Sequence, residues 1–191
     1  MNSFLVGTGV FLIEIVFGLF ILAVLLRLLF QIVRADFYNP LAQFTVALTN
    51  PVLRPLRRVI PGLFGVDVAS IVLLLLLQML EIYLIGLLVG RTVALDVLVY
   101  SAVVELLLLT LYVFIVAIIV RSLLSWIVPY GAPRNPAMSL LLSLTEPLLR
   151  PARRRLPDIG GVDLSPLAVM ALLWIAASAV RHFLLMPPWL R

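Results

Sequence analysis

Long and nearly unbroken apolar runs alternate along this chain with short segments rich in arginine and proline. Four runs approach or exceed the ~20 residues that a helix needs to cross the ~30 Å hydrocarbon core of a bilayer. They predict membrane-spanning helices at about residues 4–31, 68–89, 97–127 and 166–185. At ~1.5 Å per residue the first and third would be roughly 40 Å long or more, so both should tilt or extend into the interface.

Composition supports the same class of protein. The chain has 191 residues, of which 64% are hydrophobic and only 12% are charged. A soluble domain of this length needs far more polar surface, so we expect an all-α, polytopic membrane protein with four transmembrane helices. The first apolar run lacks a basic leader and is too long for the core of a secretory signal, so it should remain as a mature span.

Two polar segments are copies of one another. The segment TNPVLRPLRRVIPGLFGVDV, residues 49–68, aligns with TEPLLRPARRRLPDIGGVDL, residues 145–164, and eleven of the twenty pairs are identical. The match continues upstream through the pair Asn39-Pro40 and Asn135-Pro136. The chain is therefore a tandem duplication of one unit that consists of a long span, a connector and a second span.

The duplication predicts the domain organisation. The first repeat covers residues 1–95 with a connector at 36–67, and the second covers 96–191 with a connector at 130–165. Because each repeat holds two spans, an even number, both repeats enter the membrane in the same orientation. The repeats are thus expected to be parallel rather than inverted.

The ordered motifs RSLLSWIVPYGAPRNP and TEPLLRPARRRLPDIGGVDLSP, followed by an apolar span, resemble the YggT (YlmG-like) family of small bacterial and plastid membrane proteins. The resemblance covers essentially the whole chain as two copies, and the second copy fits better. In the first copy Asn50 replaces Glu146, and Gln31-Ile32 and Ala69-Ser70 replace Ser125-Trp126 and Ser165-Pro166. The resemblance implies association with cell division, plastid nucleoid distribution or cytochrome maturation, and, through a bacterial relative, with osmotic tolerance and potassium uptake.

Each connector predicts an interfacial amphipathic helix followed by an arginine- and proline-rich turn. The segments NPLAQFTVALT and NPAMSLLLSLT are mildly amphipathic and should lie in the interface. A new short helix should begin at Pro51, capped by Asn50, and at Pro147, capped by Thr145 or Glu146. Pro55 and Pro151 follow four residues later in the two copies, so each connector should be kinked there.

The ends of the connectors predict turns and helix caps. Gly65 and Gly161 permit a tight turn before the next span. Asp67, and Asp163 or Ser165, are expected to cap that span, and the aspartates are also local partners for arginine.

All fourteen basic residues are arginine, and the formal net charge is +5. The connectors, together with Arg34 just before the first of them, carry nine of these residues, whereas the opposite side carries only Arg91, Arg181 and Arg191. The positive-inside rule therefore places both connectors in the cytoplasm and both termini outside. The resemblance implies that the membrane is the inner membrane of a bacterium. Arg27 and Arg121, near the cytoplasmic ends of the long spans, are expected to snorkel toward the headgroups.

The connector arginines are the candidate site for anionic phospholipids or partner proteins, because basic residues beside an anionic leaflet each contribute ~1 kcal/mol of attraction. Membrane topology by itself is the alternative explanation of their number. The candidate residues are Arg54, Arg57, Arg58, Arg150, Arg153, Arg154 and Arg155.

Three glutamates interrupt the apolar runs. Glu14, Glu81 and Glu105 all fall in the outer halves of their spans at comparable depth, so they form a candidate intramembrane polar site. A carboxylate there costs at least ~2.5 kcal/mol on insertion scales, so such groups face a bundle interior, a partner or a water-filled cavity. Hydrogen bonding between helices, a cation or proton site, and contact with another membrane protein are the three interpretations.

Catalytic signals are absent from the sequence. The chain has no HExxH, GxSxG, P-loop or dinucleotide-binding motif, and without cysteine it has neither disulfides nor thiolate chemistry. We expect no cofactor, no metal site and no direct nucleic-acid binding. The leading hypothesis is a non-enzymatic inner-membrane scaffold or assembly factor that contacts other membrane proteins or itself. The alternatives are an ion-handling component linked to osmotic stress and, third, a lipid-processing enzyme.

Overall fold

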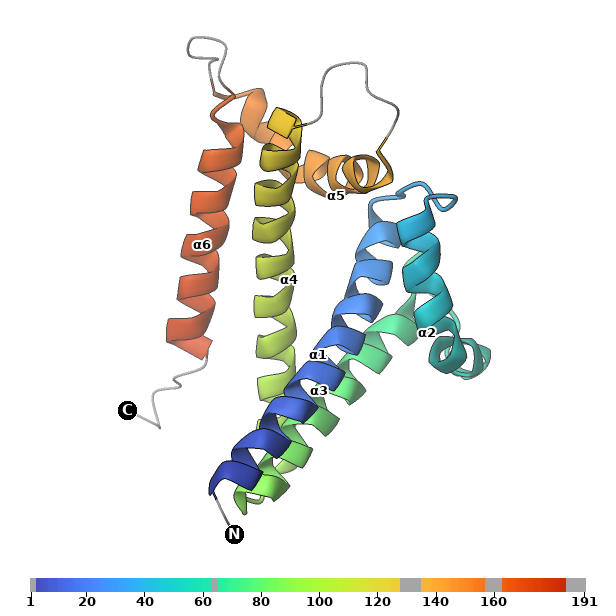
Figure 1. The fold of residues 1–191 in the computed structure, drawn as a ribbon, viewed down its shortest axis with the longest axis vertical. Coiled ribbons are helices and arrows are strands. Elements are labelled where there is room, and N and C mark those ends of the chain that lie inside the picture. The colour runs from blue at the N-terminus through green and yellow to red at the C-terminus, as the bar shows by residue number, and fades with distance from the viewer. Residues whose placement is uncertain (1–2, 63–64, 128–134, 157–162, 185–191) are drawn as a thin grey trace. The chain divides into compact units, whose positions relative to one another are not determined.

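The structure is a computed structural model that describes residues 3–62, 65–127, 135–156 and 163–184. These residues form an all-α fold, and no other regular element occurs within the described ranges (Figure 1). In chain order the helices are α1 (Ser3–Ile32), α2 (Pro40–Val59), α3 (Val68–Val89), α4 (Leu95–Ile127), α5 (Pro136–Arg153) and α6 (Ser165–Leu184).

Four of these helices are long and apolar enough to cross a membrane, namely α1, α3, α4 and α6. The predicted all-α class with four spans is confirmed, and the span boundaries lie within two residues of the expected ones. The 30 residues of α1 and the 33 residues of α4 exceed the ~20 needed to cross the hydrocarbon core. Large apolar side chains along these helices, such as Phe11 and Val116, are exposed, as expected of surfaces that face lipid.

The connector helices α2 and α5 begin at the repeated Asn-Pro pairs. The side chain of Asn135 accepts a hydrogen bond from the backbone N–H of Ala137 at 2.9 Å, and that of Asn39 accepts one from Leu41 at 3.0 Å. Proline then occupies the first helical position, where its missing N–H has no cost. Each connector is thus one helix, which begins where the interfacial helix was predicted and continues through the segment predicted as a separate short helix.

The expectation of a separate helix starting at Pro51 or Pro147 is therefore wrong. Pro51 and Pro55 lie inside α2, and Pro147 and Pro151 lie inside α5. An internal proline cannot donate to the carbonyl four residues earlier and its ring crowds that carbonyl, so it bends a helix without necessarily ending it. Figure 1 shows the axes of α2 and α5 changing direction before their C-terminal ends, in agreement with the expected kink.

The turn from α2 to α3 contains the predicted glycine conformation. Gly65 has φ +80, in the left-handed region that favours glycine. Asp67 occupies the N-cap position of α3, but its side chain caps no backbone N–H; its carboxylate is used by other side chains instead. The equivalent Gly161 lies outside the described residues.

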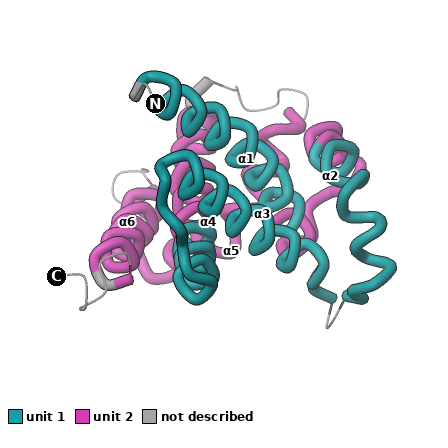
Figure 2. Tube along the Cα trace, turned by 90° about the horizontal axis from the view of Figure 1, so that it is seen from below, with its two compact units in different colours: residues 1–28, 45–107 teal, residues 29–44, 108–191 magenta. Residues whose placement is uncertain are grey.

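The chain divides into two compact units, coloured separately in Figure 2. Unit 1 consists of residues 1–28 and 45–107, which include most of α1, most of α2, all of α3 and the start of α4. Within it, a Cβ added at Gly9 of α1 would lie 3.2 Å from a methyl group of Leu88 in α3. The small residue therefore allows α1 and α3 to pack closely where the start of one meets the end of the other.

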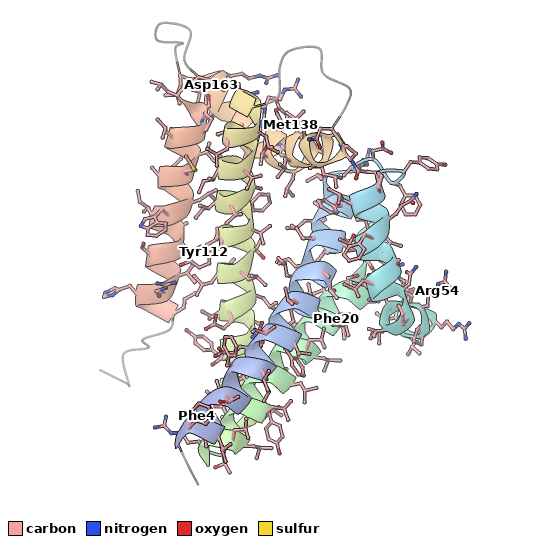
Figure 3. All side chains as sticks on the ribbon, in the orientation of Figure 1. Phe4, Phe20, Arg54, Tyr112, Met138 and Asp163 are labelled. Atoms are coloured by element: carbon pink, nitrogen blue, oxygen red, sulfur yellow. The ribbon has the colours of Figure 1, made fainter. Side chains whose placement is uncertain are left out.

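Unit 2 consists of residues 29–44 and 108–191. Its described helices meet in a buried apolar cluster of Ile118 from α4, Leu149 from α5 and Val169 from α6. Farther along the same pair of spans, Arg181 of α6 donates a 2.6 Å hydrogen bond to the hydroxyl of Tyr112, which is labelled on α4 in Figure 3. These contacts join both spans of the unit to its connector helix.

The two Asn-Pro segments also touch each other inside unit 2. The Asn39 side-chain amide donates to the backbone carbonyl of Pro136 at 2.7 Å and to the hydroxyl of Ser139 at 2.9 Å. Asn39 is only 4% exposed, so its side chain is enclosed by this contact. The start of the first connector is therefore bound directly to the start of the second.

Candidate functional site

In the first repeat, an arginine of the long span is bound to the connector helix. Arg27 is 8% exposed, and its Nη1 donates to the hydroxyl of Thr49 at 2.6 Å and to the side-chain oxygen of Asn50 at 3.0 Å. The Thr49 hydroxyl in turn donates to the carbonyl of Thr45 at 2.7 Å. Arg27 therefore does not snorkel to the headgroups as expected, because neutral acceptors on α2 satisfy its charge inside the protein.

The second repeat contains the same connection. Arg121 donates to the hydroxyl of Thr145 at 2.7 Å, and two of its nitrogens lie 3.3 Å from the carboxylate of Glu146. Thr145 also donates to the carbonyl of Leu141 at 2.6 Å. Both threonines are fully buried, so each repeat uses one span arginine and one connector threonine to hold its connector helix.

A second repeated connection joins the end of each connector helix to the start of the following span. Arg57 of α2 forms an ion pair with the buried Asp67, which also accepts a hydrogen bond from the hydroxyl of Ser70. In the second repeat Arg153 of α5 donates to Asp163 at 2.8 Å. The arginine and the aspartate are identical at the matched positions of the two repeats, so the duplication has retained both members of this ion pair.

The ion pairs keep both aspartates charged. Burial opposes ionisation of Asp67, but the hydrogen bonds from Arg57 and Ser70 outweigh it and hold the pKa of this carboxyl below its ordinary value of 3.8. For Asp163, burial again opposes ionisation, and the hydrogen bonds from Ser165 and Arg153 lower the pKa. The bond to Asp163 is also the main cause that raises the pKa of Arg153.

The aspartates fulfil the predicted capping role to different extents. The Asp163 carboxylate accepts the backbone N–H of Ser165 at 2.9 Å, at the first residue of α6. Asp67 makes no such bond, because its oxygens are occupied by Arg57 and Ser70. The predicted aspartate cap therefore binds a backbone N–H at the start of α6. At the start of α3 the aspartate binds side chains instead.

Glu146 adds a carboxylate that the first repeat lacks. It lies between two guanidinium groups, at 3.3 Å from Arg121 and 3.2 Å from Arg153. The first repeat has Asn50 at this position, which accepts from Arg27 alone among the described contacts. The two repeats thus share one framework but differ in charge at its centre.

The other five of the seven predicted binding arginines have a different environment. Among the residues that the structure describes, no carboxylate forms an ion pair with them, and all are exposed. Figure 3 shows Arg54 extending away from α2. We call this set the exposed arginines; its members are Arg54, Arg58, Arg150, Arg154 and Arg155. Of the seven predicted binding residues, Arg57 and Arg153 instead serve in the ion pairs.

Three of the exposed arginines line a shallow open hollow at the C-terminal end of α5. Its volume is about 320 Å³. The lining residues are Pro147, Arg150, Pro151, Arg154 and Arg155. The bend-forming prolines therefore also shape the surface between the arginines.

The intramembrane glutamates belong to three different helices of unit 1. Glu81 of α3 is 8% exposed and accepts a 2.8 Å hydrogen bond from the Gln78 amide. Glu14 of α1 and Glu105 of α4 are near enough to act electrostatically on Glu81. Within the described ranges, no group of three or more histidines, aspartates or glutamates is arranged to hold a metal ion.

Comparison with known proteins agrees with this duplicated architecture. The model of the CCB3/YggT family matches residues 6–88 and again residues 100–184. The chain belongs to the CCB3/YggT family. The two matched segments coincide with the two sets of span, connector and span, so the YggT unit is the repeated unit.

Bacterial relatives of this YggT family protein align over most of their length. The uncharacterized protein PA0392 of Pseudomonas aeruginosa is 42% identical over 83% of this chain and 81% of its own. The uncharacterized protein YggT of Escherichia coli is 34% identical over 93% of this chain and 92% of its own. No solved structure matches the chain. The protein is thus a multi-pass membrane protein homologous to bacterial YggT.

Proposed function

We propose that this protein is a non-enzymatic scaffold of the bacterial inner membrane. Its working surface is the set of exposed arginines, which bind anionic lipid headgroups or acidic surfaces of partner membrane proteins. The observation that carries the proposal is the division of the connector arginines into two groups. Arg57 and Arg153 are neutralised by aspartates, whereas the exposed arginines carry positive charge with no carboxylate partner among the described residues.

The framework supports this assignment because it binds each connector helix to two membrane-spanning helices. Arg27 and Arg121 bind the connector helices to the long spans, and the ion pairs bind them to the following spans. An interaction surface held at two points loses little conformational freedom on binding, which favours affinity. The positive-inside rule places both connectors in the cytoplasm, where the leaflet is anionic.

Complementation tests this function. In an Escherichia coli strain that lacks its YggT relative, cell morphology and growth at high osmolarity are compared after expression of wild-type protein and variants. Replacing all five exposed arginines with glutamine should abolish complementation while membrane insertion and protein level stay unchanged. The matched variant carries Glu14→Gln, Glu81→Gln and Glu105→Gln and should complement fully. Full complementation by the arginine variant would reject the scaffold assignment.

Ion handling is the second candidate function, supported by the convergence of three glutamates from three helices. Glu81 is buried beside Gln78 and within electrostatic range of Glu14 and Glu105. A four-span chain is small for a pore, so conduction would require an oligomer with these carboxylates along the path. Potassium and proton flux into proteoliposomes should then disappear in the triple glutamine variant. Flux no greater than that of empty vesicles would remove this candidate.

A further inference from the structure

The hollow at the end of α5 concentrates positive charge in a small space. Three of its five lining residues are arginines, and the other two are prolines. Among the described residues, the nearby carboxylates Glu146 and Asp163 are both bonded to Arg153, which does not line the hollow. The connector network thus neutralises the arginine beside the hollow and leaves those that line it without an ion-pair partner among the described residues.

The lining chemistry fits a phosphate group. A guanidinium donates two parallel hydrogen bonds to phosphate oxygens, and arginine remains charged at any physiological pH. Pro147 and Pro151 have no backbone N–H, so they offer ring surface and no backbone donor. A ligand with a charged phosphate and an adjoining apolar part matches this combination better than a fully hydrated anion.

The position of the hollow favours a lipid over a soluble ligand. Leu149, next to Arg150 in the sequence, is fully buried against Ile118 and Val169 of the two spans. The same turns of α5 therefore bury leucine toward the spans and expose arginine on other sides. This is the arrangement of a helix that lies at headgroup depth, where phospholipid phosphates are concentrated.

We propose that the hollow formed by Pro147, Arg150, Pro151, Arg154 and Arg155 is a binding site for the phosphate of an anionic phospholipid headgroup. This inference rests on the proposed function and specifies the lipid-binding part of it. It also distinguishes the repeats. Arg54 and Arg58 match Arg150 and Arg154 in the first repeat, but Val59 stands where the second has Arg155. The second repeat should therefore hold the lipid more tightly.

The test measures lipid retention by the purified full-length protein. The protein is exchanged into detergent that contains equal amounts of phosphatidylglycerol and phosphatidylcholine, and the bound lipids are counted by native mass spectrometry. The hollow variant carries Arg150→Gln, Arg154→Gln and Arg155→Gln, and its first-repeat control carries Arg54→Gln and Arg58→Gln. We expect the preference for phosphatidylglycerol to fall roughly tenfold or more in the hollow variant and much less in the control.

Two further variants test the contribution of the third arginine, which distinguishes the two repeats. Arg155→Val introduces the residue that the first repeat carries at the matched position, and it should weaken the preference by roughly fivefold. Val59→Arg, added to the hollow variant, should restore part of the lost retention because it supplies the missing third arginine to the first repeat. Thermal unfolding of each variant confirms that the fold is intact.

The outcomes separate the lipid from other ligands. Unchanged phosphatidylglycerol retention in both the hollow variant and Arg155→Val would overturn the site. Displacement of the lipid by an equal concentration of glycerol phosphate would also overturn it, because the site would then recognise a soluble phosphate. If the hollow variant loses lipid retention but the variant without the five exposed arginines complements fully, the scaffold function is rejected and the lipid site stands. If the hollow variant retains the lipid but the variant without the five exposed arginines fails to complement, the lipid site is rejected and the scaffold function stands.

Discussion

At the residue scale, the connectors show how the same side-chain type serves two purposes. Arg57 and Asp67 form an ion pair between the end of α2 and the start of α3, and Asp67 is only 6% exposed. Arg54 and Arg58, three positions and one position away, have no such partner among the described residues. The spacing of arginines in the sequence does not distinguish these roles, because the distinction depends on where the aspartate lies after the chain has turned.

Asp67 is buried more deeply than Asp163, so its replacement should reduce the stability of the protein more. Asp67→Asn removes the charge partner of Arg57 and should destabilise the protein by about 1–3 kcal/mol. Asp163→Asn should cost less, because the Asp163 side chain is 39% exposed and water can replace it as a partner for Arg153. Thermal unfolding of both variants in one detergent measures the difference. Equal loss of stability in the two variants would contradict this account.

A pH dependence follows from the lowered pKa of Asp67. A carboxyl whose pKa is lower in the folded state stabilises the fold above its unfolded pKa, and this contribution is lost as pH falls through the folded value. The stability difference between wild type and Asp67→Asn should therefore be constant near neutral pH. It should shrink only below about pH 4, the range of an unperturbed aspartate. Unfolding curves recorded from neutral to acid pH check this; a difference that vanishes already at pH 6 would be inconsistent with it.

At the scale of the element, the spans could be predicted from the sequence and the connector helices only in part. Long apolar runs have one stable arrangement in a bilayer, so their ends were located closely. The starts of α2 and α5 agree with the predicted interfacial helices. A second helix start was wrongly placed at Pro51 and Pro147, because these prolines follow residues that can cap a helix. Asn39 and Asn135 offer the same capping signal eleven residues before Asn50 and Glu146, and there the structure uses it.

Burial explains why the connector helices continue through their prolines. Thr49 and Leu53, and equally Thr145 and Leu149, lie four residues apart on one helical face and are almost fully buried in both repeats. Ending the helix at proline would remove these residues from their shared face. The contacts of that face and the buried arginine bonds thus compensate for hydrogen bonds that the prolines cannot make.

The proline bend can be measured directly in α5. Spin labels at Met138→Cys and Arg154→Cys are 16 positions apart in the sequence, which corresponds to about 24 Å in a straight helix. The bend should make the measured distance shorter than that value. Replacing Pro147 and Pro151 with alanine should lengthen it toward the straight-helix distance. An unchanged distance would show that the prolines do not cause the bend.

At the scale of the whole molecule, duplication could be recognised from the sequence, but the bonds that use it could not. Arg27 and Arg121 recur in both repeats, yet their spacing to the connector motif differs by two residues. Their acceptors, Thr49 and Thr145, lie more than twenty residues away along the chain. The sequence showed that an arginine and a threonine recur in both repeats. It did not show that the arginine of each repeat binds the threonine of the same repeat, because the two are close only in the folded chain.

The orientation in the membrane can be tested because the chain has no cysteine. Single cysteines are introduced at Val59, at the end of α2, and at Thr92, between α3 and α4; both positions are exposed. With connectors in the cytoplasm, a membrane-impermeant maleimide should label Thr92→Cys in cells with a permeabilised outer membrane. It should label Val59→Cys only after the inner membrane is opened. The opposite pattern would reverse the orientation.

The bond from Asn39 to the second connector has a consequence for biosynthesis. Its acceptor, Pro136, lies 97 residues farther along the chain. At ribosomal rates of ~5–20 residues per second, that acceptor is made roughly 5–20 s after Asn39. Until then the Asn39 side-chain amide lacks the acceptor that it uses in the folded protein. The nascent first half is therefore an incomplete product, and its maturation is timed by translation of the second.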